Sequence, residues 1–467
     1  MNFTNKRIST LSLTMLNISA IVSLSSIAFM ATIGLQSVFF YIVAAITFLL
    51  PTSLICAELS SMITKNNGGV FSWVKAGLGE KAGVVAMWLE WFNNVVGFPS
   101  SVTALIATLS YVGFRSFTEN TQTNFGFWLA MVATFVCISI FNFLPLRKTV
   151  LLNIIGAIFG MILPGVLLMA GAIYFIVTGQ SHLEYHGVSD IIPVFSLATY
   201  ALLVKTLSSY SGIQSVAFHM TNIDNPQKNI PRSILMATVL IVSLTIFATL
   251  ALMIVVPVKD VNVLNGLIQG ISAILNIIGL GDMKPVIAVM VTVGMLAALS
   301  TWVLGPARGM QTAAKQNFFP KVMVGINKAG MPINMLTIQI IIVIFLSLTF
   351  LVMPSIYAAF ALLVAITSQF TVVMWIMVFA AAIRMRFTKP DAHRVFYVGK
   401  RGTNWLLVSM SCVAMFMCML GFVLGLFPPS FSHVKNVFQY TMILVTSDVV
   451  IVAIPLIWIW LHRKRLF

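Results

Sequence analysis

The stretch LSSYSGIQSVAF (Leu207–Phe218) interrupts an otherwise apolar segment that runs from about Phe195 to Met220. Its residues 208–212 are all small, hydroxylated or glycine. In hydrocarbon, a backbone that leaves the helical hydrogen-bond ladder is tolerated only where protein or a water-filled cavity satisfies its amides and carbonyls. The stretch therefore predicts a helix that is broken at mid-membrane and contributes to a binding site.

The composition is that of a polytopic membrane protein. Of the 467 residues 59% are hydrophobic and only 8% are charged, whereas a soluble domain has roughly 25% charged residues. The net charge of +16 suggests a nucleic-acid partner at first sight, but the basic residues are scattered between apolar runs and do not cluster on one face. We therefore expect the lipid bilayer as a partner and no nucleic acid.

Apolar runs of roughly 20 residues, enough to cross about 30 Å of hydrocarbon, predict an all-α protein with twelve membrane-spanning helices. We expect the first to act as an uncleaved signal and the chain to form a single transporter domain over residues 1–467. The predicted helices cover residues 9–33, 36–62, 83–113, 125–144, 150–178, 195–220, 232–257, 284–314, 332–353, 355–383, 404–427 and 437–461.

The basic residues predict the orientation of these helices. Most of the 27 Lys and Arg residues fall in the two tails and in alternate loops, while Arg115, Lys259, Lys284 and Lys435 fall in the others. The positive-inside rule then places both termini in the cytoplasm. The predicted location is a bacterial inner membrane, crossed many times.

The first predicted helix carries a similar polar interruption, IVSLSSIA at Ile21–Ala28. Two interruptions five helices apart are what an inverted five-helix repeat predicts. The repeats would cover about 9–178 and 195–383, with two additional helices over 404–461. The alternative is that these serines bond to carbonyls of their own helices or pack against neighbouring helices.

Three further stretches resemble a known family. They are CAELSSMITKNNGGVFSWVKAGLG (Cys56–Gly79), STWVLGPARGMQTAAKQNFFPKV (Ser300–Val322) and FAAAIRMRFTKPDAHRVFYVGKRG (Phe379–Gly402). Together they are similar to the amino acid, polyamine and organocation transporter superfamily. The third resembles its glutamate/GABA antiporter branch, in which this loop typically ends L-R-Y-K-K-P-D-x-x-R-P-Y.

The resemblance extends from about Leu11 to Pro455. It implies an inverted-repeat fold with discontinuous helices 1 and 6, and exchange or uptake of amino acids by alternating access. Our first hypothesis is an antiporter for amino acids or their decarboxylation products, such as glutamate and GABA. A proton- or sodium-coupled symporter of amino acids or polyamines stays open, and a membrane sensor that does not transport is a more remote alternative.

A physical argument supports an amino acid as the ligand. A broken helix exposes amides at one fragment's N-terminus and carbonyls at the other's C-terminus, each equivalent to about half a charge. The amides can hold a carboxylate and the carbonyls an ammonium, so a zwitterion fits. The predicted substrate-binding residues are Ile21, Ser23, Ser25, Ser26, Ile27, Ser208, Tyr210, Ser211, Gly212 and Trp302.

Four residues are candidates for gating or selectivity. Lys205 is a cation about one turn before the break, which either attracts an acidic substrate or snorkels to the outer interface. Gln214 stands where the family often has a glutamate, so position 214 itself cannot titrate. Glu90 is a membrane carboxylate expected to line the route or to titrate, and Trp91 beside it is a weaker candidate.

Aromatic rings make plausible gates because a ring can cover a zwitterion and contact its ammonium. Trp302 occupies the place of a tryptophan that packs on the substrate in related arginine/agmatine antiporters, and Tyr210 lies at the break itself. With nine Trp and 35 Phe in the chain, packing or an interface belt is the general alternative for each ring. By contrast we interpret Glu58 as structural.

Enzymatic chemistry is not predicted. The chain has no G-x-S-x-G, H-E-x-x-H or C-x-x-C motif, and its four cysteines (Cys56, Cys137, Cys412 and Cys418) fall inside apolar spans without metal-ligand spacing. We expect no cofactor and no metal site. A sodium-linked mechanism would use hydroxyls such as Ser300 and Thr301. The oligomeric state, monomer or homodimer, stays open.

Overall fold

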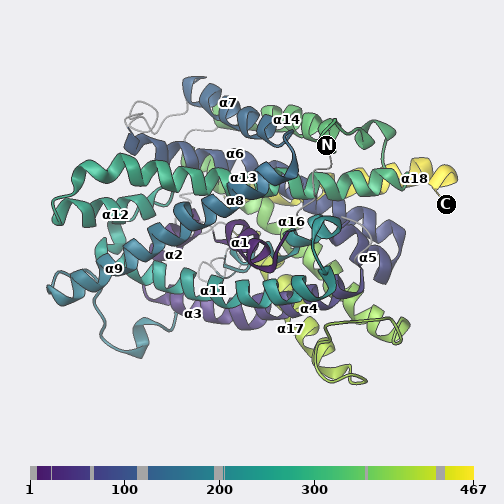
Figure 1. Cartoon of the computed structure of the whole chain (residues 1–467), viewed down its shortest axis with the longest axis horizontal. Coiled ribbons are helices and arrows are strands. Elements are labelled where there is room, and N and C mark those ends of the chain that lie inside the picture. Colours follow the sequence, from purple (N-terminus) through teal and green to yellow (C-terminus); the bar gives the residue numbers. More distant parts are fainter. Residues whose placement is uncertain are drawn as a thin grey trace.

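The computed structural model describes residues 8–22, 24–63, 68–112, 125–193, 203, 206–352, 356–427 and 437–466. Throughout these ranges the regular structure is helical (Figure 1), apart from one isolated parallel bridge between Ile8 and Ile223. Long helices such as α6, α13 and α14 pack side by side. The predicted all-helical class is therefore confirmed.

In its described residues, the first half of the chain contains ten helices and two π-helical turns. They are α1 (Thr10–Ile21), α2 (Leu24–Ala31), α3 (Gln36–Ala44), η1 (Ala45–Leu49), α4 (Leu50–Met62), α5 (Val70–Leu78), α6 (Glu80–Leu109), η2 (Ser110–Val112), α7 (Phe125–Phe141), α8 (Leu146–Ala157), η4 (Ile158–Ile162) and α9 (Leu163–Val177).

In the described part of the second half, a three-residue 3-10 helix and the ten-residue 3-10 helix η6 precede the long helices. Its elements are η5 (Val188–Asp190), η6 (Ile213–Asn222), α11 (Pro226–Val255), η7 (Val258–Asp260), α12 (Gly266–Ile277), η8 (Gly281–Met283), α13 (Lys284–Lys315), η9 (Lys321–Val324), α14 (Ile333–Ser347), α15 (Thr349–Val352), α16 (Ile356–Thr388), α17 (Trp405–Leu424) and α18 (Val437–Leu466).

Nine helical segments in the described ranges are long and apolar enough to cross a membrane, judged by length and composition. The chain is therefore a multi-pass membrane protein. The other three predicted helices differ from these nine. The first is split into α1 and α2, the fourth is the shorter α7, and the sixth lies partly outside the described residues.

The predicted break in the first membrane helix is present. α1 ends at Ile21, and the next residue, Val22, is extended with φ −69° and ψ 101°. Helical structure resumes at Leu24, while Ser23 lies outside the described residues. Because Val22 leaves the helical conformation, the helix ladder is interrupted within a membrane segment.

The second break also occurs where the sequence predicts it. Thr206–Ser209 are helical, a turn follows, and Gly212 has φ +141°, which side chains other than hydrogen rarely permit. The fragment beyond it differs from an ordinary membrane helix. It is the ten-residue 3-10 helix η6, and such a long 3-10 stretch often marks a hinge or local strain.

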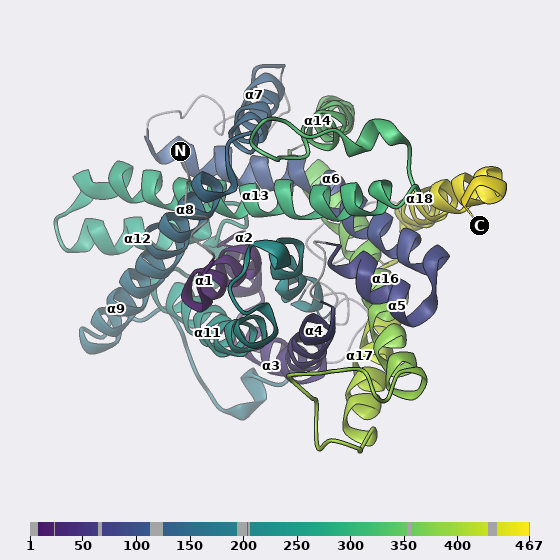
Figure 2. The same cartoon turned by 45° about the vertical axis from the view of Figure 1, so that its right-hand side comes forward.

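The two broken segments occupy the interior of the bundle. Figure 2 shows α1 and α2 inside a ring of longer helices, and α1 packs against α8, α11, α13 and η6. The backbone amide of Ile8 donates to the carbonyl of Asn222 at 3.0 Å. The chain before α1 is thereby joined to the end of η6, so both breaks belong to one packed unit.

Two helices that the sequence analysis did not predict lie between the spanning segments. α5 follows α4, and the glycines at its ends, Gly69 and Gly79, have φ values of +51° and +99°. α12 packs against α2, α9 and α11. With nine and twelve residues, both are too short to appear as spans in a search for runs of about 20 apolar residues.

A buried ion cluster ties α4 to the end of α16 and the loop that follows. The Glu58 carboxylate accepts from Nε of Arg386 at 2.9 Å and pairs with Nε of Arg394 at 3.1 Å. The backbone amide of Val398 donates to Glu58 at 2.8 Å, and the Arg386 guanidinium lies 3.7 Å from the Tyr397 ring centre. These contacts support a structural role for Glu58.

We predict that Glu58→Ala lowers the stability of the folded protein by about 3–5 kcal/mol, because two buried guanidinium groups would lose their carboxylate. Thermal unfolding of the detergent-solubilised protein measures this change. The control is Glu80→Ala, whose ion pair with Lys75 is partly exposed and should contribute less than about 1 kcal/mol. Equal melting temperatures for the two variants would contradict the structural role.

Candidate functional site

A cavity of about 250 Å³ lies between the two helix breaks. It is bounded by α1, α2, the segment before η6, η4, α6, α13 and α16. Its described lining consists of Ser19, Ala20, Ile21, Val22, Ser26, Asn93, Asn94, Gly97, Phe98, Ser100, Ser101, Ala104, Met161, Ser208, Ser209, Ser211, Met295, Ala298, Leu299, Trp302, Phe360, Val364, Thr367, Ser368 and Thr371.

The cavity lies near the middle of the long helices and extends toward one of their ends. The lining residues of α6 fall between Asn93 and Ala104, from its middle into its C-terminal half. Those of α13 fall between Met295 and Trp302, and those of α16 in its first half. In the opposite half of α6, Trp88 and Trp91 are buried in the core. The site is therefore central but asymmetric.

Residues from both breaks meet at the cavity. Ser19–Val22 come from the end of α1, and Ser208, Ser209 and Ser211 come from the second break. The hydroxyl of Ser209 donates to the hydroxyl of Ser26 on α2 at 3.2 Å. Interrupted backbone and a high density of hydroxyls thus face the same space.

Trp302 forms one wall of the cavity and is fixed by the first break. Its indole Nε1 donates to the carbonyl of Ala20 at 2.9 Å. This carbonyl lies in the last turn of α1, where the helix leaves carbonyls without intrahelical partners. The hydrogen bond therefore satisfies a backbone group and sets the position of the ring.

Gly212 is a second point of contact between the two breaks. A Cβ atom at this position would lie 2.7 Å from Cγ1 of Ile21 and 3.1 Å from Cζ2 of Trp302. The residue does not line the cavity but packs behind it. Its backbone amide donates to Oε1 of Gln214 at 2.9 Å.

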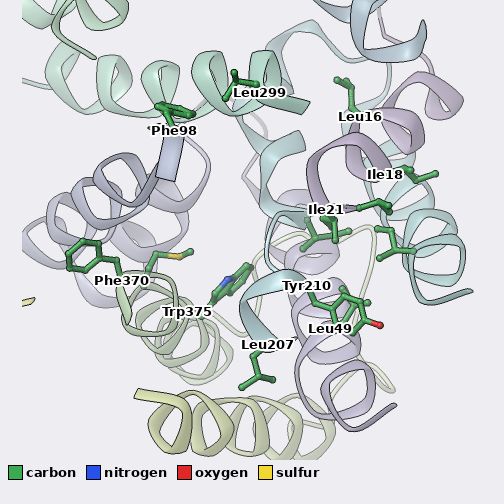
Figure 3. Packing of buried hydrophobic residues seen from close by; sticks show 14 of the residues in the cluster. Leu16, Ile18, Ile21, Leu49, Phe98, Leu207, Tyr210, Leu299, Phe370 and Trp375 are labelled. Atoms are coloured by element: carbon green, nitrogen blue, oxygen red, sulfur yellow. The ribbon is translucent and has the colours of Figure 1, made fainter. Parts of the chain in front are cut away.

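Tyr210 lies behind the cavity wall. Its hydroxyl shares a 3.0 Å hydrogen bond with Thr245 on α11, and its ring lies against Tyr41 with centroids 5.8 Å apart. Figure 3 shows Tyr210 beside Ile21 among buried side chains. Neither Tyr210 nor the buried Ile27 lines the cavity, so the structure does not place them among residues that face a ligand there.

The candidate gating residues Glu90, Trp91 and Gln214 are buried outside the lining. Nε2 of Gln214 donates to Oε1 of Glu90 at 3.0 Å, and the Trp91 indole donates to Gln339 on α14 at 3.0 Å. Glu90 and Gln214 thus form a pair, whereas Trp91 belongs to an aromatic cluster with Trp88.

Three predicted residues cannot be placed fully. Lys205 and Ser23 lie outside the described residues. Ser25 belongs to α2, but its side chain is not described. Their predicted roles in selectivity and binding stay predictions.

Sequence reasoning missed the side of the site that α6 and α16 contribute. Asn93 and Asn94 line the cavity, as do Thr367, Ser368 and Thr371. The signal was visible as adjacent amides and as a polar TSQFT stretch inside apolar runs. Without tertiary structure, however, nothing indicated that these two helices face the breaks.

Trp375 on α16 is another residue that the sequence analysis did not select. Its indole donates to the Ser211 hydroxyl at 2.9 Å. Figure 3 shows the ring pointing from α16 toward the segment that carries Tyr210. A tryptophan therefore donates a hydrogen bond to each break, Trp375 of α16 to the second and Trp302 of α13 to the first.

The hydroxyls proposed for sodium have protein partners. Ser300 donates to Oδ1 of Asn142 at 2.9 Å, and Thr301 donates to Oδ1 of Asn153 at 2.8 Å. In the part of the chain that the structure describes, no group of three or more His, Cys, Asp and Glu residues could hold a metal ion. These hydroxyls tie α13 to the region around α8.

Comparisons with known proteins agree with this architecture. The amino acid permease family model matches residues 8–447. An uncharacterised transporter of Legionella pneumophila is 32% identical over 467 residues, which cover 100% of this chain and 98% of the relative. A glutamate/gamma-aminobutyrate antiporter of Lactococcus lactis is 28% identical over 470 residues, covering 98% and 92% respectively. A probable agmatine/putrescine antiporter of the same species is 24% identical over 313 residues, 65% of each chain.

A helical membrane bundle with a central polar cavity between two broken segments defines a membrane transport protein, not an enzyme. The family match covers nearly the whole chain. The chain belongs to the amino acid permease family, which lies within the superfamily that the sequence motifs resemble.

We predict that Gly212→Ala reduces transport at least tenfold, because the new methyl group would collide with Ile21 and Trp302 at a backbone conformation that favours glycine. Uptake per inserted protein in membrane vesicles measures this. Gly34→Ala is the matched control, since Gly34 has φ +73° but no atom within 4 Å of the added Cβ. If both variants transport equally, the contact between the breaks is not required.

Proposed function

We propose that this protein is an antiporter that exchanges amino acids across a bacterial inner membrane by alternating access. The observation that carries the proposal is the meeting of two broken membrane segments at one central cavity. The proposed architecture is a single domain of twelve membrane helices with a five-plus-five inverted repeat and two additional helices, and both termini in the cytoplasm.

The chemistry of the cavity supports a zwitterionic substrate. The carbonyl end of α1 and the turn at the second break offer partial negative charge to an ammonium group. The start of α2 offers amides, and Ser26 a hydroxyl, to a carboxylate. In this proposal Ser23, Ser25, Ser208 and Ser211 complete the contacts with the substrate backbone.

The asymmetry of the cavity supports alternating access. With the amino terminus inside the cell, the C-terminal half of α6 and the first halves of α13 and α16 lie toward the outside, and the cavity extends that way. In the same orientation the buried Trp91 and Phe218 and the bridge between Ile8 and Ile223 belong to the inner half. Release to the cytoplasm would require this half to open, and the 3-10 helix η6 is a suitable hinge.

The substrate side chain would face α6 and α16, where amides and hydroxyls line the cavity. Such a surface suits a polar side chain that accepts and donates hydrogen bonds. Glutamate and GABA are the first pair to assay. Two relatives that are similar over most of the chain are named glutamate/gamma-aminobutyrate antiporters.

Coupled symport is the second candidate. A proton-linked cycle is favoured by the buried Glu90, whereas a sodium-linked cycle would have to use the hydroxyls of Ser300 and Thr301, which already bond to Asn142 and Asn153. A polyamine substrate is a further variant, prompted by the agmatine/putrescine relative. A membrane sensor without transport activity is the remaining alternative.

Counterflow in proteoliposomes tests the proposal. Vesicles loaded with one amino acid should accumulate a labelled amino acid from outside without any ion gradient, because exchange needs only two substrates. The panel should include glutamate, GABA, glutamine, arginine, agmatine and neutral amino acids. Accumulation that requires a proton or sodium gradient would favour symport, and no movement of any compound would favour the sensor.

We predict that Lys205→Ala raises the KM for glutamate about tenfold while leaving that for glutamine nearly unchanged, if Lys205 attracts an anionic side chain. The same counterflow assay gives both constants. Lys259→Ala, in the loop at η7 away from the cavity lining, is the control. Equal effects of Lys205→Ala on both substrates would remove this role.

A further inference from the structure

Glu90 is a buried carboxylate that the proposed substrate site does not use. Its residue is 1% exposed, and it lies in the N-terminal half of α6, inside a membrane-spanning segment. Among the residues that the structure describes, its side chain has one hydrogen-bond partner, the neutral amide of Gln214. A carboxyl group in such a setting usually pairs with a cation, binds a proton or faces a cavity.

Three cations on neighbouring helices have partners other than Glu90. Arg308 on α13 bonds to His219 and Asn222 of η6, and Arg386 on α16 bonds to Glu58. Lys75 on α5 pairs with Glu80 at the start of α6. None of these groups is bonded to Glu90.

The remaining described cations of α6 and its neighbours lie near helix ends. They are Lys81 in the first turn of α6, Lys284 and Lys315 at the two ends of α13, Arg384 near the end of α16, and His462 near the end of α18. Two further titratable groups near α6 carry no positive charge. The thiol of Cys56 on α4 is close enough to interact electrostatically with Glu90. Asp448 belongs to α18, which also packs against α6, and its carboxylate has no hydrogen-bond partner in the described chain. α7 and α14 present no charged residue at all. Glu90 thus lacks a described counter-charge and is suited to hold a proton.

Two hydrogen bonds connect Glu90 to the second helix break. Gln214 donates to Glu90 at 3.0 Å, and the same amide group accepts from the backbone N–H of Gly212 at 2.9 Å. A charge on Glu90 polarises this short chain of hydrogen bonds toward the break. Gly212 in turn packs against Ile21 and Trp302, both of which line the cavity.

Glu90 is also close to the cavity along its own helix. Asn94, one turn later and about 6 Å along the axis, lines the cavity and donates from its side chain to the backbone carbonyl of Glu90 at 2.7 Å. A negative charge at this depth acts on a bound substrate through a medium that screens less than water.

We propose that Glu90 is a proton-binding residue whose protonation strengthens the binding of substrates with an anionic side chain. The inference rests on the proposed amino acid exchange and adds a proton-dependent selectivity to it. An ionised Glu90 repels an anionic side chain and favours a cationic one. A protonated Glu90 removes that repulsion, so acidification shifts preference toward anionic substrates.

The test compares glutamate with glutamine, which differ in charge but little in size. Their KM values are measured in counterflow between about pH 5.5 and 8, a range in which free glutamate keeps its side-chain charge. For the unchanged protein, the ratio of the glutamate KM to the glutamine KM should fall about tenfold on acidification.

Two variants of the same helix make the test specific. Glu90→Gln should hold the ratio at its low-pH value throughout the range, because the amide resembles the protonated acid. Glu80→Gln, in the first turn of α6 and partly exposed, should keep the full pH dependence. A pH-independent ratio in the unchanged protein, or an unaltered pH dependence in Glu90→Gln, would overturn the inference.

Gln214→Leu provides a second route if Glu90→Gln is not produced in folded form. This variant retains Glu90 but removes the amide that donates a hydrogen bond to its carboxylate. The ionised form is then less stable, so the change in the ratio of the glutamate KM to the glutamine KM should occur at higher pH. An unmoved transition would overturn the proposed role. No counterflow of any amino acid by the unchanged protein would instead overturn the proposed exchange, and this role with it.

Discussion

The rest of the structure depends on one constraint, which is that interrupted backbone in a low-dielectric interior must find hydrogen-bond partners. Each break is therefore surrounded by groups that supply them. The Trp302 indole donates a hydrogen bond to the Ala20 carbonyl at the first break. At the second, the side-chain oxygen of Gln214 accepts a hydrogen bond from the backbone N–H of Gly212. Long helices such as α6, α13 and α16 position these side chains, and the cavity is the space that the breaks leave between them.

Glu58 and Glu90 are both buried, but their surroundings give the two carboxyl groups different roles. Glu58 is held by two guanidinium groups and a backbone amide, so its negative charge is neutralised and it fastens α4 to the loop after α16. Glu90 is held by one neutral amide close to the cavity. The same side chain is structural in one place and available for proton binding in the other, because the partners differ.

Much of the fold could be predicted, because burial in hydrocarbon demands long apolar helices whose pattern is visible in the sequence. The breaks at Val22 and Gly212 were also predictable, since serine and glycine clusters stand out in apolar segments. The 3-10 conformation of η6 and the short helices α5 and α12 were not, because they depend on packing. Tyr210 lies at the break in sequence, yet its ring turns away toward Thr245.

By itself, the sequence determined the membrane class, the family and the place of both helix breaks, because these follow from local composition, motif and periodicity. Only the tertiary structure decided which side chains meet at the breaks. It brought Asn93 and Thr367 into the cavity lining and put Gln214 beside Glu90, a residue 124 positions earlier. Such pairings depend on how helices far apart in the sequence pack together. The sequence pattern of one segment does not indicate which other segment packs against it.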